Sequence, residues 1–113
     1  MTNKMSGITT HVLDTSRGRP AEGVPVSLEK HDGNYWTFIG RGETDHDGRC
    51  RTLLNDPLQR GIYRLTFAIA QYFGEGNTFF PEAVIVFDVK DETQHYHVPL
   101  LVSPYGYSTY RGS

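Results

Sequence analysis

The sequence lacks the features that define several classes of protein. It has 1 cysteine, Cys50, in 113 residues, which excludes an intrachain disulfide framework and a four-thiolate zinc site. Lys and Arg number 11 against 13 Asp and Glu, so the net charge of −2 gives no basic field for nucleic acid. No apolar run approaches the roughly 20 residues of a membrane-spanning helix. The opening MTNKMSGITTHVLD lacks the apolar region of a signal peptide, which predicts a cytoplasmic protein.

The composition that remains suits one folded domain rather than a disordered chain. Hydrophobic residues make up 37% of the sequence and charged residues 21%, and the aromatics include 7 Tyr and 6 Phe. No internal repeat, low-complexity tract or linker divides it. A domain of this size exposes much of its surface, so partner subunits are a plausible source of further burial.

Short β-branched and aromatic runs alternate with turn signals along the chain, which predicts an all-β sandwich or barrel. In the second run Val24, Val26 and Leu28 share one face, as a half-buried strand requires. A short helix is expected within residues 68–74, ended by glycines. We expect strands over residues 8–14, 24–30, 35–40, 49–53, 61–70, 83–89 and 95–102.

Two of the late predicted strands are apolar on both faces: residues 83–89 apart from Asp88, and residues 95–102 beyond Pro99. A strand of this kind needs cover on both sides. Because the chain has so few helices to supply that cover, we expect another subunit to do so, with the interface on these strands.

Histidines are the most suggestive residues for chemistry. His95 and His97 are two positions apart on a predicted strand, so both point to one face, and His11 lies on the opening strand. His11 is interpreted either as an ordinary strand histidine or as part of a shared site. A zinc site of His11, His95 and His97 is an alternative, because neutral imidazoles bind zinc well. His31 and His46 lie in predicted turns and are expected to face solvent.

Arg49 follows the turn TDHDG and begins a predicted strand. Its planar guanidinium could bind a carboxylate, an oxyanion or a ring carbonyl, or it could be solvated or paired with Asp45 or Asp47. Cys50, with no adjacent base, is expected to be a buried structural thiol rather than a nucleophile.

The C-terminal segment SPYGYSTYRGS is unusual, because residues at chain ends usually fray and tend to have short, polar side chains. Its tyrosines, arginine and hydroxyls suit contacts with a flat, hydrogen-bonding ligand. The alternative is that the tyrosines dock on a sheet or on a partner subunit.

With these motifs in view, the sequence resembles the transthyretin-related proteins that act as 5-hydroxyisourate hydrolases in purine catabolism. The resemblance extends over residues 7–113 and rests on ITTHVLDTSRGRPA, TDHDGR, TFFPE and HYHVPLLVSPYGYSTYRGS. It implies a single transthyretin-like domain over residues 7–113, after a flexible N-terminus of residues 1–6. The implied fold is a two-sheet sandwich with one short helix, assembled as a homotetramer (a dimer of dimers) with sites at the dimer–dimer interface. One departure is that YFGEGNTFFPE is slightly shorter than the family pattern, which concerns the length of the short helix.

The resemblance also implies the site residues and the reaction. His11, Arg49 and His97 would be catalytic, with no metal or cofactor. Substrate would be bound by the terminal residues Tyr110, Arg111, Gly112 and Ser113. The implied reaction converts 5-hydroxyisourate to 2-oxo-4-hydroxy-4-carboxy-5-ureidoimidazoline by histidine-activated water with the assistance of arginine.

Three other functions stay open at this stage. A transthyretin-like carrier would bind a small ligand without turnover. A zinc hydrolase would use His11, His95 and His97. A structural module of a larger assembly would show no small-molecule activity.

Overall fold

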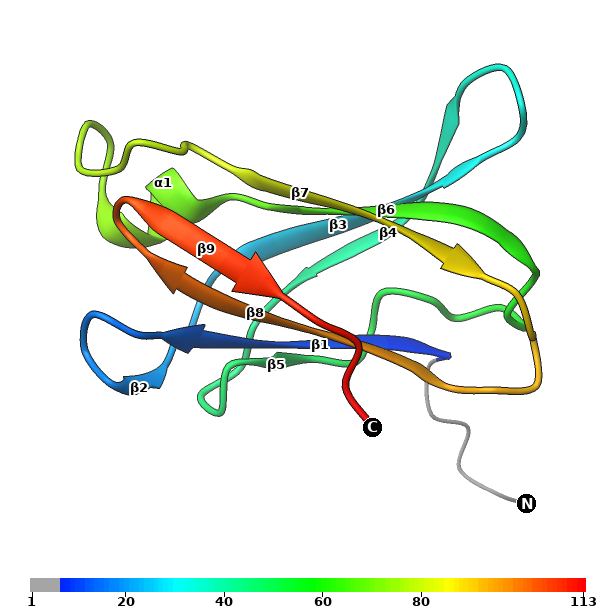
Figure 1. Cartoon of the computed structure of the whole chain (residues 1–113), viewed down its shortest axis with the longest axis horizontal. Coiled ribbons are helices and arrows are strands. Elements are labelled where there is room, and N and C mark those ends of the chain that lie inside the picture. Colours follow the sequence, from blue (N-terminus) through cyan, green and yellow to red (C-terminus); the bar gives the residue numbers. More distant parts are fainter. Residues whose placement is uncertain (1–6) are drawn as a thin grey trace.

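The computed structural model describes residues 7–113, which form two packed β-sheets and one short helix (Figure 1). The two-sheet, all-β sandwich with one short helix is therefore confirmed. The flexible N-terminus expected over residues 1–6 lies outside the described residues. Within residues 7–113, no helix has the length and apolar character needed to cross a membrane.

Sheet A carries the predicted site residues of the first and last strands. Its strand order is β2-β1-β8-β9, and β5 pairs with β1 beside β2. β1 and β8 are parallel, whereas the other pairs are antiparallel. The strands are β1 (Ile8–Asp14), β2 (Arg19–Pro20), β5 (Arg49–Cys50), β8 (Tyr96–Ser103) and β9 (Gly106–Thr109).

Sheet B is antiparallel and has the order β4-β3-β6-β7. It consists of β3 (Pro25–His31), β4 (Trp36–Glu43), β6 (Gly61–Phe67) and β7 (Ala83–Val89). The helix α1 (Ile69–Phe73) follows β6 directly. β7 ends sheet B and β9 ends sheet A, and the two lie on the same side of the sandwich (Figure 1).

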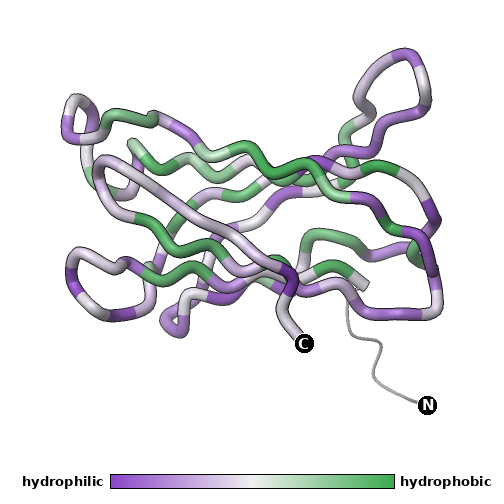
Figure 2. The backbone as a smooth tube through the Cα atoms, viewed as in Figure 1, coloured by the Kyte–Doolittle hydropathy of each residue, from purple (hydrophilic) through white to green (hydrophobic). Residues whose placement is uncertain are grey.

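The core lies between the sheets and follows the alternation of the strands. Apolar stretches run along the strands, while the connecting loops are mostly hydrophilic (Figure 2). Val24, Val26 and Leu28 are buried together, as predicted. Sheet A contributes Ile8, Val12, Val98, Leu100 and Val102, and β6 contributes Tyr63, Leu65 and Phe67.

Several predicted strand limits are wrong. The strand expected over residues 49–53 ends at Cys50. The strand expected over residues 61–70 ends at Phe67, because Ile69 begins α1 and is buried from the helix instead. The C-terminal segment forms the additional strand β9, which the sequence did not predict. Residues 8–14 and 83–89 form strands with the predicted limits.

A buried carboxylate joins β1 to the helix. The Asp14 side chain is fully buried, and its Oδ2 accepts a 2.7 Å hydrogen bond from the Tyr72 hydroxyl. Its Oδ1 accepts bonds from the hydroxyl and the backbone N–H of Ser16. Burial alone would raise the pKa of Asp14, but these hydrogen bonds outweigh it and hold the pKa below the usual value. The charged carboxylate therefore fixes α1 against the end of β1.

The outer face of β7 is only partly covered in the single chain. Val84 is 39% exposed and Val86 is 56% exposed. The outer apolar face expected for this strand is therefore present, and a single chain leaves it partly exposed to solvent.

Candidate active site

A cavity of about 310 Å³ lies where β1, β5 and the start of β8 meet the end of the chain. It contains three of the predicted site residues, Arg49, His97 and Ser113. His95, which the zinc alternative named, also lines it. The remaining lining residues are Thr9, Thr10 and Arg51.

One hydroxyl contacts both histidines of the HYH motif. The parallel register of β1 and β8 places Thr9 beside His97. The Thr9 Oγ1 lies 2.9 Å from His97 Nδ1 and 2.9 Å from His95 Nε2. Thr9 is only 4% exposed, so its hydroxyl is held in place by the sheet. The shared contact confirms that His95 and His97 face the same side.

Arg49 is positioned by the turn before it and by pairing with β1. β5 places Arg49 opposite His11. Oδ1 of Asp45 accepts a 3.0 Å hydrogen bond from the Arg49 backbone N–H. Gly48, with φ +77°, brings the turn so close to β1 that a Cβ there would lie 2.4 Å from the Val12 carbonyl oxygen. A side chain at this position would push the turn, and with it Arg49, away from the cavity.

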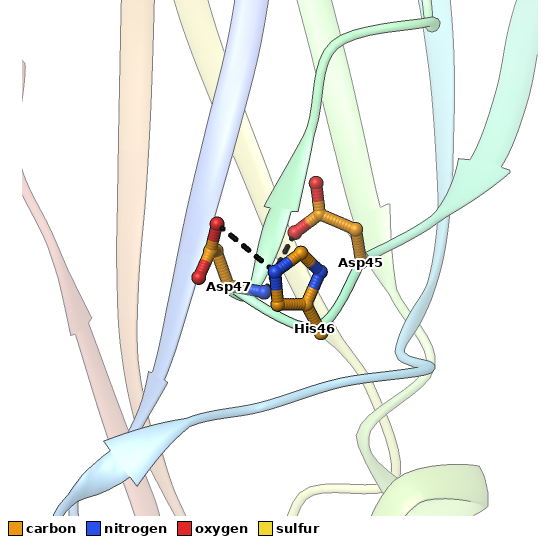
Figure 3. A group of neighbouring side chains, drawn as sticks. All are labelled: Asp45, His46 and Asp47. Carbon is orange, nitrogen blue, oxygen red and sulfur yellow. Dashed lines mark hydrogen bonds and ion pairs between the residues drawn. The ribbon is translucent and has the colours of Figure 1, made fainter.

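The same turn holds a group of potential metal ligands (Figure 3). In residues 7–113 it is the one group of three or more such residues whose ligand atoms all lie within 4.8 Å of one another. It consists of Asp45, His46 and Asp47. Oδ1 of Asp45 also accepts a hydrogen bond from the Asp47 backbone N–H, and His46 is exposed, as predicted. These contacts stabilise the turn that carries Arg49.

The zinc alternative finds no support in the arrangement of the histidines. His11, His95 and His97 do not place three ring nitrogens within 4.8 Å of one another in the part of the chain that the structure describes. Two of those nitrogens instead contact the Thr9 hydroxyl.

His97 lies in surroundings that disfavour its charged form. Burial lowers the pKa of His97 below its ordinary value, because the imidazolium loses hydration. Electrostatic interactions with Arg49, His95, His11 and Arg51, in that order, lower it further. His97 is therefore neutral at pH 7 and can accept a proton.

The end of the chain packs on His97. The Gly112 backbone N–H donates a 2.8 Å hydrogen bond to the His97 carbonyl oxygen. A Cβ at Gly112 would lie 2.6 Å from Cδ2 of the His97 ring. Only a glycine lets the backbone approach the imidazole this closely, and this approach brings Ser113 to the cavity.

Tyr110 and Arg111 lie elsewhere in the single chain. They line a separate cavity of about 280 Å³ bounded by β7, β8 and β9. The Arg111 guanidinium donates a 2.8 Å hydrogen bond to Gln94 Oε1 and lies 4.4 Å from the centre of the Tyr96 ring. Of the terminal YRGS, Gly112 contacts His97 and Ser113 lines the same cavity as His97.

His11 lies beside the cavity rather than among its lining residues. It follows Thr9 by two positions on β1, so the two side chains share a face. It is half-buried, with Arg49 opposite it on one side and Pro99 on the other.

Thr9, Thr10 and Arg51 line the cavity but were not predicted from the sequence. Two of them follow from strand alternation, because Thr9 is two positions before His11 and Arg51 two positions after Arg49. Strand alternation could therefore have identified Thr9 and Arg51. Only the parallel pairing of β1 with β8, however, shows that Thr9 meets the histidines.

Comparisons with known proteins show which proteins the chain is similar to. The chain matches the model of the HIUase/Transthyretin family over residues 8–112. It is 48% identical to a 5-hydroxyisourate hydrolase of Caulobacter vibrioides over 115 residues, covering 96% of this chain and 100% of that protein. The structure of the Klebsiella pneumoniae 5-hydroxyisourate hydrolase matches with a TM-score of 0.83 and 40% identity, covering 96% of this chain and 100% of that one. A sea bream transthyretin in complex with thyroxine matches with a TM-score of 0.86 and 30% identity, covering 94% of each chain.

Proposed function

Because this chain belongs to the HIUase/Transthyretin family, we propose that it is a hydrolase that opens the six-membered ring of 5-hydroxyisourate in urate degradation. The observation that carries this function is the cavity in which the neutral His97, Arg49 and Ser113 lie together. The product is 2-oxo-4-hydroxy-4-carboxy-5-ureidoimidazoline.

The reaction needs a base and a group that stabilises negative charge. Water attacks the carbonyl carbon of a ring amide, and its proton passes to an imidazole. The carbon–nitrogen bond then breaks, and the leaving nitrogen takes a proton, which yields a carboxylate and a ureido group. A neutral imidazole suits the first transfer near pH 7, and a fixed cation suits the oxygen that becomes negative.

The residues divide these tasks. His97, whose pKa is held low by burial and neighbouring cations, activates the water, and His11 beside it shares the proton transfers. Arg49 polarises the attacked carbonyl, and its position is fixed by the Asp45 turn. Ser113 orients substrate or water, Gly112 allows it to reach the site, and Tyr110 and Arg111 contribute to substrate binding within the assembled protein.

A homotetramer, a dimer of dimers, is part of this proposal. β7 and β9 end their sheets on the same side, so their outer backbone groups are available to a second copy. The exposed Val84 and Val86 give that side apolar area to bury.

We also place the protein in the cytoplasm, where the free, buried Cys50 stays reduced.

A carrier without turnover is the second candidate, and the match to a thyroxine-bound transthyretin favours it. Binding without turnover does not require a neutral imidazole beside a fixed arginine. The two functions differ in stoichiometry, because a carrier removes at most as many ligand molecules as it has sites.

The test is to generate 5-hydroxyisourate in solution by oxidising urate and to follow its ultraviolet decay. We expect trace amounts of the protein to accelerate the decay over many turnovers, with the same rate after treatment with a chelator. Binding in proportion to protein, with no faster decay, would support the carrier. Loss of activity on chelation, restored by zinc, would support the zinc hydrolase.

A further inference from the structure

The contact between Thr9 and two imidazoles restricts where their protons lie. A threonine hydroxyl has one hydrogen, so Thr9 can donate to His95 Nε2 or to His97 Nδ1 but not to both. Both distances are 2.9 Å. The hydroxyl oxygen also has two lone pairs, so when both rings are neutral at least one ring nitrogen donates its N–H to Thr9.

What His97 can do depends on whether its Nδ1 accepts from Thr9 or donates to it. If His97 accepts from Thr9 through Nδ1, its proton is on Nε2, and that nitrogen cannot act as a base. If His97 donates from Nδ1 instead, Nε2 carries a free lone pair. Thr9 then donates to His95 Nε2. Only a His97 that donates from Nδ1 is able to take a proton from water at Nε2.

We propose that Thr9 and His95 are positioning residues that hold His97 in the tautomer with Nε2 unprotonated and then take up the proton that His97 receives. This inference rests on the proposed hydrolysis. His95 and the buried hydroxyl act through His97 rather than on the substrate.

The proton transfer balances along the chain of contacts. After His97 Nε2 takes a proton from water, Nδ1–H passes its proton to Thr9 Oγ1, and the Thr9 hydroxyl proton passes to His95 Nε2. Thr9 ends as it began, His97 is neutral again, and the positive charge lies on His95. The reverse sequence supplies a proton for the leaving nitrogen.

The surroundings favour this direction of transfer. Burial and the Arg49 and Arg51 cations disfavour a charge on His97. His95 lies outside β8 and is exposed to solvent, which hydrates a charged imidazole. His95 also borders the cavity of about 760 Å³ that adjoins the site, so a proton can leave to water there.

The variants Thr9→Val, Thr9→Ser and His95→Gln test the role of the hydroxyl and the second imidazole. Valine keeps the shape of threonine without the hydroxyl, and serine keeps the hydroxyl. We expect Thr9→Val and His95→Gln to lower kcat/KM at least about 10-fold, less than the roughly 100- to 10,000-fold of a general base itself. Thr9→Ser should stay within about threefold of the parent protein on the same scale. His31→Gln, at the half-buried end of β3 in sheet B, is the matched control.

The second readout is the ¹⁵N NMR spectrum of the imidazoles, which reports tautomers without any substrate. We expect His97 to be protonated at Nδ1 in the parent protein and Thr9→Ser, and to shift towards Nε2–H in Thr9→Val. A His97 that is protonated at Nε2 in the parent protein would overturn the inference, as would full activity in both Thr9→Val and His95→Gln. If the parent protein does not hydrolyse 5-hydroxyisourate, the proposed function fails, whereas the spectrum still decides the tautomer.

Discussion

At the scale of single residues, the proposed chemistry depends on keeping one histidine neutral. His97 is surrounded by cations and is partly removed from water, and both effects act on it in the same direction. Arg49 is one of these cations, and in the proposed reaction it polarises the attacked carbonyl. Basic and electrophilic groups can therefore lie side by side without the base being protonated.

The pH dependence of catalysis follows from the direction of that shift. Lowering the pKa of His97 keeps its base form populated to a lower pH than an ordinary histidine. The rising limb of kcat/KM should therefore have its midpoint below 6.5, the usual value for histidine. A pH profile of kcat/KM measures this midpoint directly. A midpoint above 6.5 would show that another group acts as the base.

Gly112 offers a substitution with a matched control. A methyl group at Gly112 would lie 2.6 Å from the His97 ring, so either the ring or the tail must move. We expect Gly112→Ala to lower kcat/KM by about 10-fold or more, since small displacements of positioned groups are costly. Gly106→Ala should have little effect, because a Cβ there meets only Ser103 Oγ at 3.9 Å. Equal activity of the two variants would contradict the described contact.

At the scale of secondary structure, the buried Asp14 determines how α1 attaches to β1. The Tyr72 hydroxyl and the Ser16 groups satisfy a fully buried carboxylate. We expect Tyr72→Phe to lower the free energy of unfolding by about 1.5–3 kcal/mol, as for a hydrogen bond to a charged group. Urea unfolding near pH 7 gives the value. Tyr35→Phe, at an exposed ring, is the control and should change nothing.

The contribution of the Asp14 carboxylate to the free energy of unfolding depends on pH. The pKa of Asp14 is lower in the folded protein than in the unfolded chain. Its contribution is therefore present above the unfolded value of about 3.9 and is lost as pH falls through the folded value. An effect of Tyr72→Phe that grows on acidification would contradict the role given to Asp14.

The same scale shows what the sequence can predict. The runs over residues 8–14 and 83–89 are bounded by turns, and their strands have the predicted limits. Strands were predicted too long where apolar alternation continued into a helix that buries Ile69. β9 was missed because the tyrosines and hydroxyls of the C-terminal segment were interpreted as contacts to a ligand rather than as a strand.

The site was predictable only in part. Arg49 and His97 could be named from the resemblance, and strand alternation could have suggested Thr9. The meeting of Thr9 with both imidazoles depends on a parallel pairing between the two ends of the chain. No local pattern in the sequence encodes that register.

At the scale of the whole molecule, the single chain leaves its site open and the apolar outer side of β7 exposed. If subunits complete the site, dissociation must lower activity by mass action. We expect specific activity to fall as the protein is diluted, in parallel with loss of the tetramer in sedimentation. A monomer with full specific activity would show that one chain contains the whole active site.

The central claim is that hydrolysis of 5-hydroxyisourate takes place at the His97 cavity. The most direct measurement is kcat/KM for the parent protein, His97→Ala, Arg49→Ala and His11→Ala, with His31→Ala as the control for a histidine outside the site. We predict that each of the first three substitutions lowers kcat/KM by about 100- to 10,000-fold while folding is retained, and that the control is unchanged. If all three stay within about threefold of the parent protein, the reaction does not take place at this site.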